Sequence, residues 1–159
     1  MSKITLEEVL SVVSYNPDTG EFVRIRNSKR ADTPMSIGYR RVRFTLGNKK
    51  YEFLAHRLAW FITHGYWPEY EIGHINGDRE DNKLENIRDV TRTENARNTK
   101  LRVDNTSGHS GVSRHQRGWK VTVSGKYIGY SECFGKAIAM RKGAEKSMEY
   151  HKNHGRLSC

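Results

Sequence analysis

Residues 72–100 read IGHINGDREDNKLENIRDVTRTENARNTK, and the order of elements predicted for this stretch is the basis of the predicted fold. The short apolar run Ile72–Ile75 predicts a strand, and the polar stretch Asn76–Glu85 predicts a long loop. The alternating run Ile87–Val90 predicts a second strand. The stretch therefore begins as two strands joined by an extended polar loop.

A helix is expected directly after the second strand. Thr91 and Glu94 have the spacing of a capping box, so the helix should begin there and run towards Lys100. The local order is then strand, loop, strand, helix.

This order can bring three polar side chains to one point: His74 on the first strand, Asn86 at the loop end and Asn95 at the helix start. A neutral imidazole can deprotonate an attacking water near pH 7. An amide oxygen is a hard donor that suits Mg²⁺. Taken without any resemblance, the same residues fit a structural histidine with asparagines that close turns.

A longer run, EIGHINGDREDNKLENIR at 71–88, resembles the HNH (ββα-metal) nuclease motif in the form found in phage homing endonucleases. TRTEN at 91–95 is similar to the end of that motif, with Asn in place of the final His. HRLAW at 56–60 and YNPDTG at 15–20 resemble flanking segments of phage members. The resemblance covers roughly residues 5–100 and implies metal-dependent hydrolysis of DNA.

The resemblance implies a role for each matching residue. His74 corresponds to the general base, Asn86 to the residue that braces the loop and holds the base, and Asn95 to a metal ligand. The implied cofactor is Mg²⁺ (or Mn²⁺), with no small-molecule cofactor. The family usually has Asp before the His as a second ligand, and this chain has Gly73 there.

The glycine leaves three interpretations open. The nuclease is active, with the metal held by Asn95, phosphate and water and helped by Glu71, Asp78 or Asp81. It is active but slow. Or the chain is a non-catalytic DNA-binding protein with a degenerate site. His56, on the helix ahead of the motif, is interpreted as structural or as a phosphate contact.

Elements upstream of the motif follow from turn and helix signals. Gly47-Asn48 separates strand candidates Tyr39–Leu46 and Lys50–Phe53, which predicts a hairpin. Leu54–His64 has helical apolar spacing, and Thr5–Val13 starts with a capping box. Glu21–Arg26 is expected to be a strand.

A second module is expected after the linker at 104–108. Strand candidates Gly111–Arg114, Trp119–Val123 and Lys126–Tyr130 precede a helix candidate, Phe134–His151. The predicted class is α+β, with an HNH nuclease-like domain at 1–103 and a sheet-plus-helix domain at 104–159.

Residues 107–151 resemble the Apetala-type DNA-binding domain, on SGHSGVSR at 107–114 and WKV at 119–121. The third strand departs from that pattern in spacing. The resemblance implies a sheet that enters the major groove of double-stranded DNA. The predicted DNA contacts are Arg41 and Arg43 on the first hairpin and Ser113, Arg114, His115, Lys120, Thr122 and Lys126 in the second module.

Composition agrees with a polyanionic partner. The formal net charge is +10. Residues 104–159 carry 10 basic and 4 acidic side chains, against 18 and 14 in the longer first part. RNA is an alternative that only the charge supports.

Other features of the sequence indicate where in the cell the protein is expected. No apolar run is long enough for a membrane span, and the first residues lack a signal-peptide core. Cys133 and Cys159 form no CxxC pair. The predicted location is the cytoplasm of a bacterial host infected by a phage, on the resemblance. The sequence makes no prediction of oligomeric state.

Overall fold

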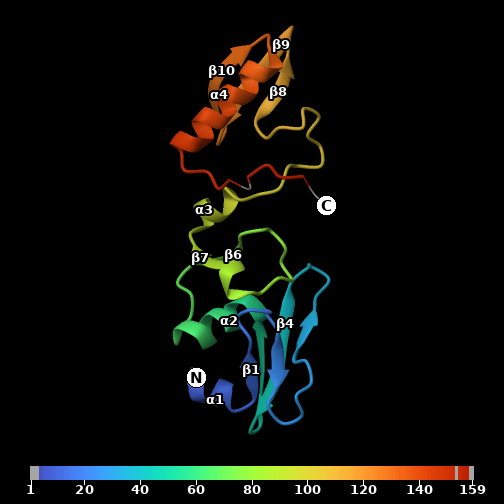
Figure 1. The fold of residues 1–159 in the computed structure, drawn as a ribbon, viewed down its shortest axis with the longest axis vertical. Helices are drawn as coiled ribbons and strands as arrows, with labels where there is room; N and C mark the ends of the chain where they lie inside the picture. The colour runs from blue at the N-terminus through green and yellow to red at the C-terminus, as the bar shows by residue number, and fades with distance from the viewer. Residues whose placement is uncertain (1–3, 153, 158–159) are drawn as a thin grey trace. The chain divides into compact units, whose positions relative to one another are not determined.

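A computed structural model describes residues 4–152 and 154–157, so Cys159 lies outside the described residues. The chain divides into two compact units, one up to Arg92 and one from Thr93 onward. Helices and antiparallel sheets occur in both units (Figure 1), which confirms the predicted α+β class. Within the described ranges, no helix is both long and apolar enough to cross a membrane.

The first unit is built from short strands around one helix. Its helices are α1 (Leu6–Leu10) and α2 (Ala55–His64), with a 3₁₀ turn η1 (Leu84–Asn86). Its antiparallel sheets pair β1 (Val13–Tyr15) with β2 (Phe22–Arg24), β3 (Asp32–Pro34) with β4 (Arg40–Leu46) and β5 (Lys49–Leu54), and β6 (Glu71–His74) with β7 (Ile87–Val90). The predicted hairpin about Gly47-Asn48 and the helix ending before Gly65 are confirmed.

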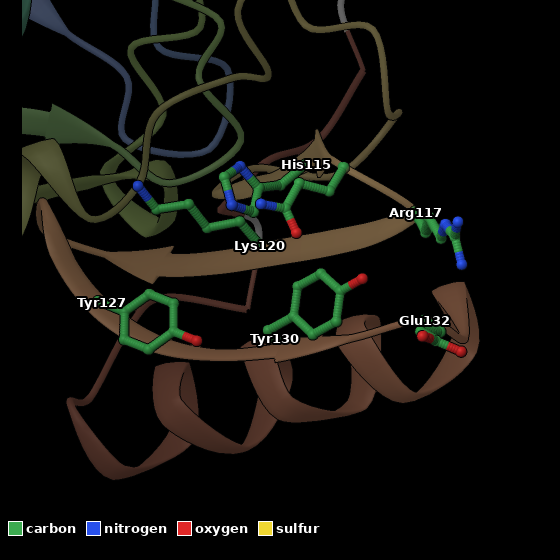
Figure 2. A pocket seen from close by; sticks show the side chains of 7 residues that line it. His115, Arg117, Lys120, Tyr127, Tyr130 and Glu132 are labelled. Atoms are coloured by element: carbon green, nitrogen blue, oxygen red, sulfur yellow. The ribbon is translucent and has the colours of Figure 1, made fainter.

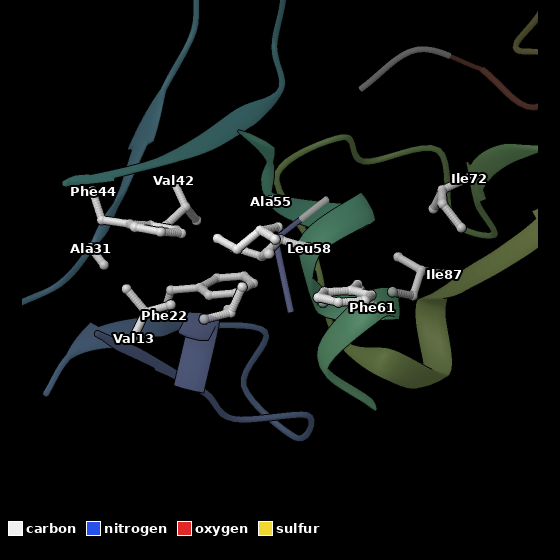
Figure 3. Close-up of a cluster of buried hydrophobic side chains, with 13 residues drawn as sticks. Val13, Phe22, Ala31, Val42, Phe44, Ala55, Leu58, Phe61, Ile72 and Ile87 are labelled. Atoms are coloured by element: carbon white, nitrogen blue, oxygen red, sulfur yellow. The ribbon is translucent and has the colours of Figure 1, made fainter. Parts of the chain in front are cut away.

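A single apolar cluster joins these elements around α2 (Figure 3). Leu58 of α2 and Phe22 of β2 are fully buried, and Ile72 and Ile87 bring the β6–β7 hairpin into the same cluster. Fully burying one such side chain contributes about 1.5–3 kcal/mol. The core thus fixes the hairpin that carries His74.

Two helices, α1 and the helix that follows β7, are shorter in the structure than the sequence predicts. The capping box of α1 is present, with Thr5 N donating to Glu8 Oε2 at 2.8 Å. The helix stops at Leu10 because Val13 enters β1 and pairs with Arg24. Helix α3 (Arg92–Ala96) likewise ends before Lys100.

The second unit contains a three-stranded antiparallel sheet and a helix. Its elements are β8 (Val112–His115), β9 (Gly118–Val123), β10 (Lys126–Ser131) and α4 (Phe134–Ser147), with β9 central. Buried Val112, Val121 and Ala137 form its small core. The register shifts between Tyr127 and Gly129, in the strand whose spacing departs from the resemblance.

Buried polar contacts close the second unit. The guanidinium of Arg141 on α4 donates to the carbonyl oxygen of Thr122 on β9, and its Nε donates to Glu145 at 2.7 Å. Leu101 N donates to Arg156 O at 2.8 Å. Gly155 N likewise donates to Thr99 O at 2.9 Å. The two backbone bonds join residues near 100 to the C-terminal segment, and the compact unit starts at Thr93, earlier than the predicted domain boundary at 103/104. The two-domain assignment itself remains a prediction.

Candidate nuclease site

His74 lies at the end of β6 and is only 6% exposed. Its ring packs edge-on against His56 of α2, with centroids 5.2 Å apart, and lies 6.0 Å from the ring of Tyr39. Burial lowers the pKa of His74 below that of an ordinary histidine. The imidazole is therefore neutral at pH 7, the form that accepts a proton.

Asn86 braces the loop that follows His74. Its Oδ1 accepts the backbone N–H of Asn76 at 3.0 Å, and its Nδ2 donates to the carbonyl oxygen of Asp81 at 2.8 Å. Its own carbonyl accepts the N–H of Ile75 at 2.8 Å. One side chain and its backbone thus hold both ends of the loop beside β6.

Asn82 is the residue that the sequence analysis missed. Its Oδ1 lies 3.3 Å from Nε2 of His74, and the residue is 1% exposed. The resemblance implied that Asn86 holds the base, whereas Nε2 of His74 faces Asn82. Asn82 sits among other polar residues of the loop, and only burial, a tertiary property, distinguishes it from them.

His56 is buried, with 5% of its surface exposed, so it fits the structural interpretation. Burial lowers its pKa to about 3, and the neighbouring His74 and Arg57 lower it further in the same direction. Among the described residues, none forms a hydrogen bond with its Nδ1. The ring is a neutral packing partner of His74.

The residues proposed around a metal come from several elements of the chain. Asn95 lies in α3, and Gly73 lies in β6 opposite Arg88 of β7. Asp78 Oδ1 accepts the N–H of Glu80 at 2.9 Å, and Asp81 Oδ2 accepts Nδ2 of Asn76 at 2.8 Å.

These contacts define what the chain offers a cation. The two carboxylates already accept hydrogen bonds that shape the loop. No group of three or more His, Cys, Asp or Glu in the described ranges could hold a metal ion. A hard amide oxygen such as that of Asn95 fits as one ligand beside phosphate and water.

The two arginines of the first hairpin are partly neutralised. Arg41 and Arg43 share one face of β4, opposite the buried Val42 and Phe44, as the alternation predicts. Arg41 Nη1 lies 3.2 Å from Glu52 Oε1, and Arg43 Nε lies 2.6 Å from Glu52 Oε2. A phosphate at this face would compete with that carboxylate.

The second unit presents an open sheet face (Figure 2). His115, Lys120, Tyr127 and Tyr130 line one hollow there, together with Gln116, Arg117 and Glu132. Lys120 of β9 lies between Ser113 of β8 and Tyr130 of β10 in the register. The two exposed tyrosines were not among the predicted contacts. Alternation alone would put residues 127 and 130 on opposite faces, and the register shift between Tyr127 and Gly129 changes that pattern.

The remaining predicted contacts lie elsewhere in this unit. The guanidinium of Arg114 lies over the ring of Trp119, 5.2 Å from its centroid, and Trp119 packs against Phe134 of α4. Arg114 is therefore stacked on the helix side of the sheet. Thr122 is half-buried beside Gly111, and Lys126 is exposed at the start of β10.

The comparison with family models agrees with the motif. No curated protein matches this chain. One solved structure, described as "DNA binding and cleavage by the HNH homing endonuclease I-HmuI", aligns with 62% of this chain at 25% identity and a TM-score of 0.49. The alignment spans 57% of that protein's length. Residues 53–97, which hold His74, Asn82, Asn86 and Asn95, match the family model described as HNH endonuclease.

Proposed function

We propose that this protein is an HNH-type endonuclease that hydrolyses phosphodiester bonds in double-stranded DNA. The observation that carries the proposal is His74, a buried neutral imidazole beside a braced loop, within the segment 53–97 that matches the HNH endonuclease model. A base with a lowered pKa is unprotonated at pH 7 and available for the reaction.

In the proposed reaction, His74 takes the proton of the attacking water. The water oxygen forms a bond to phosphorus, and the bond from phosphorus to the leaving oxygen breaks. Asn86 keeps the loop in place through its bonds to Asn76 and Asp81. The imidazole of His74 therefore stays in position when it takes up the proton and becomes positively charged. Burial beneath Tyr39 and against His56 limits movement of the ring.

We propose Mg²⁺ (or Mn²⁺) as the cofactor, with Asn95 as its ligand from this chain. When bound, the ion would supply positive charge at the scissile phosphate. Because the described residues form no carboxylate cage, most of the ligands would come from DNA and water. Binding of the ion in the absence of DNA is therefore expected to be weak.

The C-terminal part, residues 104–159, is proposed as an Apetala-type module that docks the protein on DNA. The support is the basic excess of this part and its open face with Lys120. The proposed contacts are Arg41, Arg43, Ser113, Arg114, His115, Lys120, Thr122 and Lys126. Resemblance to phage homing endonucleases extends the proposal to a phage-encoded protein in the host cytoplasm.

Plasmid cleavage tests the nuclease. Supercoiled plasmid is incubated with the full chain and Mg²⁺ or Mn²⁺, beside His74→Ala and a matched control, His64→Ala. His64 is an exposed histidine at the end of α2. Cleavage by the wild type and the control but not by His74→Ala supports the proposal. Equal cleavage by all three would assign the activity to a contaminant and remove His74 from the reaction.

A second candidate is a non-catalytic DNA-binding protein. It is favoured by Gly73, which offers no carboxylate where the resembled family has Asp. It is also favoured because the described residues include no group of three or more His, Cys, Asp or Glu that could hold a metal ion. This candidate predicts a metal-independent mobility shift of DNA without nicking. The plasmid assay and a mobility-shift assay on the same samples separate the two functions.

A further inference from the structure

The side chain of Asn82 is enclosed between His74 and the loop backbone. At 1% exposure it is one of the most buried polar residues in the described chain. Its Oδ1 lies 3.3 Å from Nε2 of His74, and its Nδ2 donates to the carbonyl oxygen of Glu80 at 3.0 Å. Both ends of the amide therefore have a partner inside the protein.

These two contacts define the protonation of the imidazole. The carbonyl of Glu80 only accepts, so the amide must turn its NH₂ group towards it. The amide oxygen then faces His74, and an oxygen requires a donor across from it. Nε2 must carry the hydrogen, which leaves the lone pair of the neutral ring on Nδ1. A base of this kind has one defined nitrogen to accept the proton.

Segments far away in sequence fix the backbone of Asn82. The hydroxyl of Tyr15 donates to its carbonyl oxygen at 2.7 Å. Leu84 N donates to Pro17 O at 3.0 Å. The Cα hydrogen of Gly20 faces the same backbone, where a Cβ would approach Lys83 N to 2.6 Å. The turn at 15–20 thus fixes the backbone from which the amide reaches the ring.

We propose that Asn82 is the positioning residue for His74, setting the Nε2–H tautomer and holding Nδ1 ready to accept a proton. The proposal rests on the proposed nuclease function and adds a residue and a nitrogen to it. When Nδ1 takes the proton, the Nε2–H···Oδ1 bond becomes charge-assisted and stabilises the imidazolium. A residue that only closed the loop would act through Glu80 and leave the ring free to change tautomer.

Other charges near His74 set the background against which this role is measured. Asp78 and Asp81 raise its pKa, Arg79 lowers it, and burial beside His56 lowers it most. A carboxylate at position 82 would add a negative charge in hydrogen-bond contact with the ring. Such a contact raises a histidine pKa by about one pH unit or more.

The kinetic test compares Asn82→Asp, Asn82→Leu and a control, Asn48→Asp, in the full chain. Asn48 is exposed in the distant hairpin turn. Asn82→Asp keeps the acceptor and is expected to move the acid limb of the kcat–pH profile up by about one unit or more. Asn82→Leu is expected to lose about 10–100-fold in kcat, with KM for plasmid within about twofold. The control keeps both values.

A measurement independent of cleavage separates this proposal from the nuclease itself. ¹⁵N NMR of the His74 imidazole reports its tautomer and pKa even if the protein cuts nothing. The expected results are the Nε2–H form in the wild type and a raised His74 pKa in Asn82→Asp. An Nδ1–H form in the wild type, or an unchanged His74 pKa and pH profile in Asn82→Asp, would overturn the role of Asn82. Absence of cleavage with the expected NMR result would overturn only the nuclease.

Discussion

Acid should destabilise the first unit through His56. The ring is buried and its pKa is lowered to about 3, from 6.5 for an ordinary histidine. Below about pH 6.5 the imidazole of His56 is protonated in the unfolded chain but not in the folded chain. The free energy of unfolding therefore falls as the pH falls. The loss is about 1.4 kcal/mol per pH unit between those two values.

The magnitude is large for a protein of this size. Moving from about pH 7.5 to about pH 5 should remove roughly 2 kcal/mol through His56 alone. Burial of His74 acts in the same direction, because its pKa is lowered too. Typical domains have a free energy of unfolding of about 5–15 kcal/mol. The first unit should therefore be most stable above pH 6.5 and weaken steadily towards pH 3.

Urea unfolding at a series of pH values measures this effect. In a Trp119→Phe background, tryptophan fluorescence comes from Trp60 and Trp67, both in the first unit. The variant His56→Gln should unfold with a pH slope shallower by about one proton than the parent. His64→Gln, on the exposed end of the same helix, serves as the matched control.

Equal slopes for His56→Gln and its parent would refute this reasoning. If His56→Gln does not fold, NMR titration of the parent decides the question. The imidazole signal of His56 should then show no protonation down to about pH 5, and a midpoint near 6 would equally contradict the buried neutral ring.

Three further outcomes follow from named positions. Gly20→Ala should lower the Tm of the first unit by more than Gly47→Ala in calorimetry, because both have positive φ but only the Cβ at 20 meets backbone atoms. Gly73→Asp should lower the Mg²⁺ concentration needed for half-maximal nicking, since the carboxylate adds a charged ligand; an unchanged concentration would exclude a metal near β6. Lys120→Ala should reduce the slope of log K against log salt for DNA binding by about one, measured by fluorescence anisotropy, while an unchanged slope would remove it from the interface.

Local signals predicted most of the elements. The turn at Gly47-Asn48, the apolar spacing of α2 and the alternation in β9 each act over a few residues, and all three elements are present. Helix α1 ended early because the pairing of Val13 with Arg24 competed with helical propensity. That pairing depends on a partner eleven residues away, which no capping pattern encodes.

The site was predictable to the same extent. The motif identified His74 and Asn86 as polar residues on neighbouring elements, and the structure places both beside one loop. The partner of the imidazole was not predictable, because Asn82 differs from Asn76 only in its burial. Arg114 likewise faces Trp119 for a reason visible in the alternation, since it shares a strand face with Val112.

The bond from the Tyr15 hydroxyl to the carbonyl of Asn82 spans 67 residues of chain. Closing a loop of that length costs more chain entropy than closing a short one. A fragment limited to residues 53–97 would lack that tyrosine. If the motif alone were transplanted into another scaffold, the imidazole of its histidine should not be held in one orientation. Activity is thus expected to require the segment before residue 53 as well as the segment that matches the family model.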